Sequence, residues 1–154
     1  MLAIISAAAM NKYIILLSLS ILISIKVSAQ NKLKIYGGKN HDQFIGCIDC
    51  SNNDLNSIWC VLGDYGSTHN PKSIWNEKGI YGSKTSKFSP YNKKAKYPPI
   101  ILDGKGKSYG YLTINKNNPK RTTDLLAKEI IEDRDQIVKD IPKYYAHTFH
   151  DRND

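Results

Sequence analysis

A motif of about sixteen residues recurs in the middle of the chain, and this period restricts the possible folds more than any other feature. Residues 57–67 (SIWCVLGDYGS) return as residues 73–83 (SIWNEKGIYGS), and a third copy begins at residue 89 (SPYN) and then stops. A unit of this size is too small to bury its own apolar face, so successive copies must pack on one another. The period therefore predicts a stacked architecture and indicates no reaction.

The composition of the repeat block, residues 51–92, argues against helices. Glycines recur at fixed places within it and are unfavourable inside a helix, so we expect them to take positive φ or to permit close approach of neighbouring backbone. Its Ser, Thr, Asn and Asp side chains are expected to hydrogen-bond their own backbone in turns. We expect its large rings to form the core, and the alternative is an exposed surface that stacks on sugars. These rings are Trp59, Tyr65, Trp75 and Tyr81.

Two β-hairpins are expected to bracket the repeats. Residues 33–36 alternate apolar and polar side chains, a glycine-rich turn follows, and residues 44–48 are apolar again. Residues 99–102 and 109–114 show the same pattern around a second turn with two glycines. The pattern predicts a small β-rich body.

One helix is predicted over about residues 122–141, with Thr122 or Thr123 as its cap and Pro142 as its end. Its apolar face carries Leu126, Ile130, Ile137 and Ile141. The predicted fold class is therefore α+β, with a single repeat-containing domain over residues 30–141 and a tail over residues 142–154.

Residues 1–29 have the pattern of a secretory signal peptide. Lys12 precedes an apolar run from Tyr13 to Ile25, and residues 27–29 (VSA) offer small side chains for cleavage. The run is shorter than the roughly 20 residues needed to span a bilayer. We expect a secreted, periplasmic or envelope protein with no membrane span after cleavage. The alternatives left open are a membrane anchor and a start at Met10.

Three cysteines in an exported chain suggest oxidising conditions. A disulfide is expected either between Cys47 and Cys50 or between one of them and Cys60. A redox-active pair would need a strand-to-helix setting, whereas the turn-forming run of residues 51–54 follows Cys50. The chain has no second C-x-x-C for a zinc site, so we expect no metal and no cofactor.

The formal net charge is +8, and its excess lies in Lys and Arg between Lys72 and Arg121. Removing Lys12 and Lys26 with the signal leaves +6. A basic surface favours anionic partners, either an envelope polymer or a polysaccharide, and the plainer interpretation is a solubilising surface. No recognisable nucleic-acid-binding motif is present, so we expect no specific nucleic acid.

Histidines offer the few candidates for catalysis. His41 and Asp42 are adjacent, so on an extended chain their side chains would point to opposite faces. His147 and His150 have the spacing of a metal pair on a helix, but two ligands are too few for a dedicated site. The sequence therefore predicts no catalytic residue.

Residues 38–42 (GKNHD), residues 45–50 (IGCIDC) and the Ser-Ile-Trp-Asn and Gly-x-Tyr-Gly-Ser repeats together resemble a group of uncharacterised secreted bacterial proteins. The resemblance covers roughly residues 34–115. Similar repeats are also found appended to exported bacterial enzymes, and no activity is established for the group. Cys60 departs from the repeat, because Asn76 and Asn92 hold the equivalent positions.

We therefore expect a non-catalytic exported module with a structural or interaction role. The alternatives are an accessory domain that binds polysaccharide or envelope polymer through its aromatic rings, and a secreted hydrolase. The sequence leaves the oligomeric state open.

Overall fold

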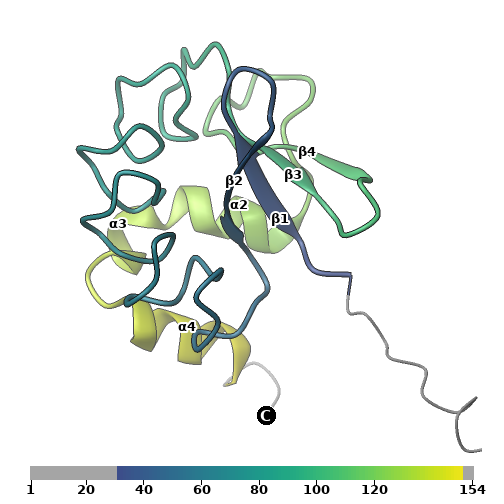
Figure 1. The fold of residues 1–154 in the computed structure, drawn as a ribbon. Coiled ribbons are helices and arrows are strands. Elements are labelled where there is room, and N and C mark those ends of the chain that lie inside the picture. The colour runs from purple at the N-terminus through teal and green to yellow at the C-terminus, as the bar shows by residue number, and fades with distance from the viewer. Residues whose placement is uncertain (1–30, 151–154) are drawn as a thin grey trace, which may run out of the picture. The chain divides into compact units, whose positions relative to one another are not determined.

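A computed structural model describes residues 31–150, and the predicted signal peptide at residues 1–29 lies outside the described residues. One antiparallel sheet of four strands has the order β2-β1-β3-β4. Its strands are β1 (Lys34–Gly37), β2 (Gln43–Cys47), β3 (Ile100–Leu102) and β4 (Ser108–Tyr111), and Figure 1 shows them beside the loops of the repeat block. With the helices near the C-terminus, this sheet confirms the predicted small α+β fold.

The two hairpins join through their first strands. Ile35 in β1 lies opposite Gly46 in β2 and opposite Ile101 in β3. Ile35 and Ile101 have no exposed surface, so the hydrophobic effect favours this pairing between strands far apart in sequence. The repeat block consequently leaves the sheet after β2 and returns to it at β3.

The helical region is divided into α2 (Leu125–Glu132), α3 (Arg134–Ile137) and α4 (Ile141–Phe149). The predictions of one helix over residues 122–141 and of a tail from residue 142 are therefore wrong. Within residues 31–150, no helix is long and apolar enough to cross a bilayer.

Aspartate side chains cap the starts of two of the three helices. The side chain of Asp124, rather than that of Thr122 or Thr123, accepts a hydrogen bond from the amide of Ala127 and begins α2. Asp140 caps α4 in the same way by accepting from the amide of Lys143. Pro142 therefore lies in the first turn of α4, where its missing N–H group is not needed.

The repeat block consists of turns that begin every third residue. In most of these turns a side-chain oxygen accepts a hydrogen bond from the amide two residues later, which satisfies backbone donors without a helix or a strand. The accepting residues are Ser51, Asp54 and Ser57 in the first group, Ser67, Asn70, Ser73 and Asn76 in the second, and Ser83, Ser86, Ser89 and Asn92 in the third. The interpretation of these polar side chains as turn formers is confirmed.

The two tryptophans occupy equivalent surroundings. The indole N–H of Trp59 donates to the carbonyl oxygen of Ile48 at 2.6 Å, and that of Trp75 donates to the carbonyl oxygen of Ile58 at 2.5 Å. Both residues are 1% exposed, and their ring centroids lie 5.9 Å apart. The tryptophan of each copy therefore attaches that copy to the segment that precedes it in the stack.

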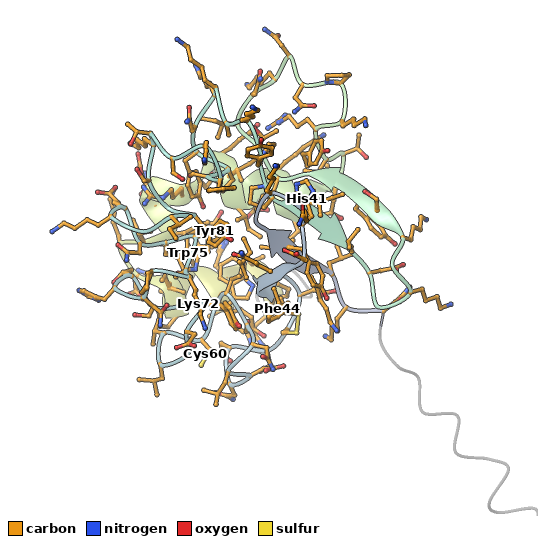
Figure 2. All side chains as sticks on the ribbon, turned by 45° about the horizontal axis from the view of Figure 1, so that its top comes forward. His41, Phe44, Cys60, Lys72, Trp75 and Tyr81 are labelled. Carbon is orange, nitrogen blue, oxygen red and sulfur yellow. A yellow bond between two sulfur atoms is a disulfide. The ribbon has the colours of Figure 1, made fainter. Side chains whose placement is uncertain are left out.

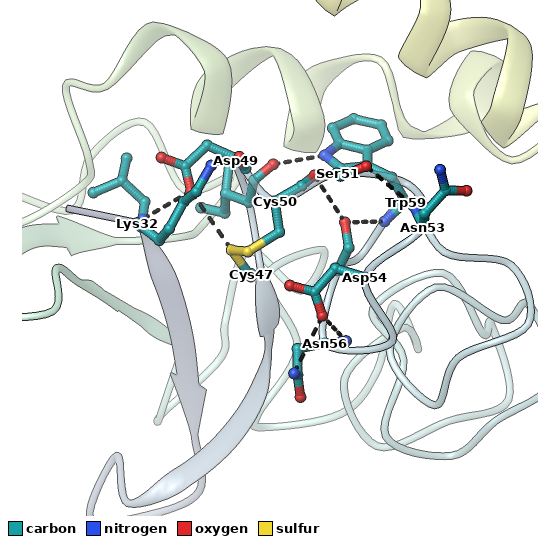
Figure 3. Close-up of a disulfide and its surroundings, with 12 residues drawn as sticks. Lys32, Cys47, Asp49, Cys50, Ser51, Asn53, Asp54, Asn56 and Trp59 are labelled. Carbon is teal, nitrogen blue, oxygen red and sulfur yellow. Dashed lines mark hydrogen bonds between the residues drawn. A yellow bond between two sulfur atoms is a disulfide. The ribbon is translucent and has the colours of Figure 1, made fainter. Parts of the chain in front are cut away.

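The first copy is hydrogen-bonded to the loop closed by the Cys47–Cys50 disulfide (Figure 3). Three carbonyl groups of this loop accept hydrogen bonds from that copy. Cys47 accepts from the Ile58 amide at 3.1 Å, Ile48 accepts from the Trp59 indole, and Cys50 accepts from the Ser57 hydroxyl at 3.1 Å. The disulfide thus constrains the segment on which the stack begins, and Cys60 is buried as a free thiol.

Removing the disulfide should loosen this attachment. We expect Cys47→Ser with Cys50→Ser to lower the free energy of unfolding by about 2 kcal/mol, because a short closed loop constrains the unfolded chain modestly. Urea denaturation followed by tryptophan fluorescence measures the change. Cys60→Ala is the control, since it leaves the disulfide intact. An unchanged free energy of unfolding in the variant without the disulfide would show that the stack does not depend on it.

The repeat glycines permit close approach instead of adopting positive φ, which the structure reserves for other glycines. A Cβ atom on Gly82 would overlap the carbonyl oxygen of Asn76, and one on Gly66 would overlap that of Cys60.

We expect Gly82→Ala to lower the free energy of unfolding by about 3 kcal/mol, because a backbone oxygen moves little to relieve overpacking. Gly104→Ala is the matched control, because the nearest atom to its Cβ would be 3.5 Å away. Thermal or urea unfolding should separate the two variants clearly; similar stabilities would argue against tight stacking.

Candidate functional site

The four rings named from the sequence as candidate sugar contacts lie mainly in the core. Trp59 and Trp75 are each 1% exposed, and Tyr81 is 3% exposed. Tyr65 is half-buried and meets Phe44 edge to face, with 4.9 Å between the ring centroids. Figure 2 shows Trp75 and Tyr81 on the inner side of the repeat loops. A stacking surface needs open ring faces, which three of these four residues do not present.

The core also uses the polar ends of these rings. The Tyr81 hydroxyl donates to the side-chain oxygen of Gln43 at 2.6 Å, which ties the second copy to the tip of the first hairpin. Trp59 contacts Tyr145 and Phe149 of α4, with ring centroids 5.9 and 5.8 Å away. Buried indole and phenol groups need such partners, so a structural role in the core accounts for these residues.

The histidines lie at separate places. His41 has a positive φ of 55°, and its Nε2 lies 3.0 Å from the carbonyl oxygen of Pro98. Because a carbonyl oxygen only accepts, this contact holds the proton on Nε2. His69 contacts the neighbouring Thr68 hydroxyl, and His147 and His150 lie at the end of α4. The structure places His41 on Pro98 and Tyr111 rather than against Asp42.

Cys47, Asp49 and Cys50 bring three potential metal-ligand atoms within 4.8 Å of one another. Both sulfur atoms are joined in the disulfide, so neither is available as a thiolate ligand. Asp49 accepts a hydrogen bond from the Leu33 amide at 2.9 Å. Burial raises the pKa of Asp49, although that amide acts in the opposite direction. The cluster therefore connects the chain before β1 to the disulfide loop (Figure 3).

The charge of the described chain is unevenly distributed. Residues 78–123, here called the basic region, contain ten lysines and one arginine against a single acid, Asp103, for a net charge of +10. The rest of residues 31–150 contains eight basic and eleven acidic side chains, for a net charge of −3. The basic region covers the third copy, both strands β3 and β4, and the segment that leads to α2 (Figure 1).

The ten lysines of the basic region are all exposed, and none forms an ion pair with any residue between 31 and 150. They are Lys78, Lys84, Lys87, Lys93, Lys94, Lys96, Lys105, Lys107, Lys116 and Lys120. The one acid offers them little compensation, because Asp103 is 5% exposed and accepts from the amides of Lys105 and Lys107. Burial acts to raise the pKa of Asp103, but these amides outweigh it and lower the pKa.

Aromatic rings hold some of these lysines in place. The Nζ atoms of Lys87, Lys96 and Lys107 lie 5.2, 5.4 and 5.2 Å from the centroids of neighbouring rings. These rings belong to Phe88, Tyr97 and Tyr109. Such contacts are worth about 0.5–1 kcal/mol at exposed sites and restrict the flexible lysine stem. Sequence reasoning missed these partly exposed rings, although each lysine stands one or two residues before its ring.

A groove of about 550 Å³ opens beside β4 within the basic region. Residues 107–110 form one wall, and Lys120, Arg121 and Thr123 form the other. The two walls are held together where Tyr111 donates its amide to the carbonyl of Lys120 at 2.7 Å. Gly110 makes this approach possible, because a Cβ there would lie 2.8 Å from the Lys120 carbonyl oxygen. The groove is therefore a fixed feature of the fold.

Arg134, in contrast, is a structural cation. It is 3% exposed, donates to Glu77 at 2.9 Å and to the carbonyl oxygen of Trp75 at 3.2 Å, and lies 4.7 Å from the centroid of the Tyr91 ring. The hydrogen bond from Arg134 lowers the pKa of Glu77. Tyr91 stands sixteen residues after Trp75, so Arg134 joins two successive copies to α3.

Comparisons with protein-family models, with curated proteins and with solved structures found no match for this chain. Its function must therefore be inferred from the placement of its own side chains. The buried aromatic residues and Arg134 account for the core, whereas the exposed lysines of the basic region have no ion-pair partner among residues 31–150 and the groove beside β4 is not used by the core. The basic region is consequently the candidate functional site.

The structural role of Arg134 can be tested apart from binding. We expect Arg134→Met to reduce the free energy of unfolding by about 2–3 kcal/mol, because the Trp75 carbonyl loses its donor and Tyr91 loses the cation. Lys139→Met is the control on the helical region, where an exposed change should stay within about 0.5 kcal/mol. Chemical denaturation measures the free energy of unfolding of both variants. If Arg134→Met left this free energy unchanged, Arg134 would not stabilise the contact between α3 and the repeat block.

Proposed function

We propose that this chain is a non-catalytic exported module that binds an anionic polymer, at the cell envelope or outside the cell, through its basic region. The observation that carries this proposal is the set of ten exposed lysines without ion-pair partners, around a single acid that is buried. Solubility alone needs no such concentration of one sign, because mixed charges serve it as well.

The distribution of charge favours a partner over a merely solvated surface. Like charges concentrated in one region repel one another and destabilise the compact state unless counter-charges approach. At physiological salt the screening length is about 8 Å, so electrostatic repulsion between neighbouring lysines is only partly screened. A bound polyanion would relieve this repulsion and release its own condensed counterions, which is the main source of affinity in such complexes.

A polymer fits the site better than a small anion. The lysines extend from the second copy of the repeat through the third copy and the β3–β4 hairpin to Lys120, and the groove among them is open. Cations spread in this way gain most from a ligand that repeats its charge along a chain, because each further contact is made at high effective concentration.

The residues of the basic region support binding without chemistry. Residues 78–123 contain no histidine and no cysteine, and Asp103 already accepts hydrogen bonds from two amides and from Asn31. General acid–base catalysis needs a titratable group within reach of the substrate with a pKa near the working pH. Asp103, the one acid of the region, is buried and already engaged, so it is not offered to a substrate.

Charge reversal tests the proposal. We expect Lys93→Glu, Lys94→Glu and Lys96→Glu together to weaken binding to acidic polysaccharide or polyglycerol phosphate by about tenfold or more at about 50 mM salt, with a shallower salt dependence. The matched control is Lys128→Glu, Lys139→Glu and Lys143→Glu, which changes the net charge equally in the helical region. Fluorescence anisotropy with labelled polymers over a salt series measures both.

The control triple should lose no more than about threefold, because it alters only the long-range field. Equal losses in the two triples would show that net charge acts without a defined surface. If the unmodified protein binds none of these polymers tighter than about 1 mM at low salt, the proposed function is wrong.

A further inference from the structure

We infer that the groove beside β4 is the specific subsite of the polymer-binding surface and that it takes one acidic sugar unit. This inference rests on the proposed function and deepens it. The rest of the basic region supplies attraction that depends on charge alone, whereas this groove combines cations, hydroxyl groups and an aromatic wall in a fixed frame.

The cations for an acid group are Lys107 and Lys120, one on each wall. Arg121 also lines the groove, but its Nε donates to the Thr113 carbonyl at 2.9 Å and its Nη2 donates to Glu132 at 2.7 Å. Arg121 therefore shapes the groove, and the two lysines remain for a ligand. A carboxylate, sulfate or phosphate on the sugar would meet an ammonium group on either side.

The remaining lining suits a sugar ring. Ser108 uses its oxygen to accept from the Gly110 amide at 3.1 Å, which leaves its proton to donate, and Thr123, an exposed residue with a hydroxyl group, also lines the groove. Tyr109 contributes a half-buried aromatic wall. Pockets for small organic groups combine apolar walls with a few placed polar groups in this manner, in volumes of about 300–1,000 Å³.

Other polyanions use this lining less well. A polyphosphate or polyglycerol phosphate chain has no ring to pack on Tyr109. A nucleic acid gains its stacking energy from several bases on several aromatic faces, and Tyr109 is the one aromatic residue that lines the groove. An acidic sugar uses the cations, the hydroxyl groups and the wall together, so it is the ligand that this groove favours.

The groove is formed before any ligand arrives. Besides the bond from Tyr111 to Lys120, the Thr122 amide donates to the Tyr111 carbonyl at 2.9 Å, and Thr122 is 1% exposed. On the opposite wall, Asp103 accepts from the Lys107 amide at 2.9 Å and fixes the β3–β4 turn. Binding therefore needs little ordering of the backbone, which favours affinity for a matched ligand.

The test compares two pairs of substitutions with equal loss of charge. Lys107→Gln with Lys120→Gln removes both lysines of the groove, and Lys93→Gln with Lys94→Gln removes two lysines of the basic region outside it. Isothermal titration calorimetry uses a tetragalacturonate, its methyl-esterified counterpart, a polyphosphate of equal charge and a single-stranded oligothymidylate. We expect the groove pair to weaken tetragalacturonate binding by about tenfold and the other pair by about threefold or less.

Amide chemical shifts of the unmodified protein give a second measurement that does not depend on variant folding. Titration with tetragalacturonate should move the signals of Gly110 and Thr123 more than those of the third copy. Equal losses in the two pairs, equal affinity for polyphosphate or oligothymidylate, or shifts confined to other residues would each overturn the subsite while leaving polyanion binding in place. Failure of every polyanion to bind would instead overturn the proposed function itself.

Discussion

The indole N–H of Trp59 donates to the carbonyl oxygen of Ile48, and the rest of the repeat block depends on this hydrogen bond. A fully buried indole must find an acceptor, because an unsatisfied donor costs about 1–3 kcal/mol. The acceptor here belongs to the loop that Cys47 and Cys50 close. Trp75 repeats the arrangement on Ile58, one residue before Trp59, so the position of each copy determines the position of the next.

This succession of tryptophan hydrogen bonds explains how a chain segment with few strands and no helices can build a core. Turns begun by Ser, Asn and Asp satisfy the backbone locally, and the tryptophan rings supply the buried area that the turns themselves lack. Helices α3 and α4 then close the other side, where Arg134 reaches the Trp75 carbonyl and Tyr145 packs on Trp59. The apolar side chains of the copies are thereby used inside the molecule, and their lysines are left outside.

The same arrangement separates structural charge from charge that is free to bind. Arg134 and Arg121 are both engaged by acids and by backbone carbonyls, and they hold the helices to the repeat block and to the segment before α2. The lysines of the basic region have no such partners. Arginine suits the anchoring role because its planar fork makes several directed hydrogen bonds, whereas lysine acts as a mobile point charge toward a ligand.

Local rules in the sequence determined the hairpins, the turns and the period of the repeat, because glycine, asparagine and alternating apolar residues act on their immediate neighbours. The sequence also carried the signals for the helix breaks, Asp140 before Pro142 among them, but a continuous apolar stripe across residues 126–141 concealed them. Only the tertiary structure decided that Cys47 pairs with Cys50 and leaves Cys60 free, that Trp59 and Trp75 are interior, and that Lys107 and Lys120 line one groove. The disulfide itself is local, with a sequence separation of 3. The burial of the tryptophans and the groove depend on contacts between segments farther apart in the chain, and spacing along the sequence does not contain the distances that such contacts bring about.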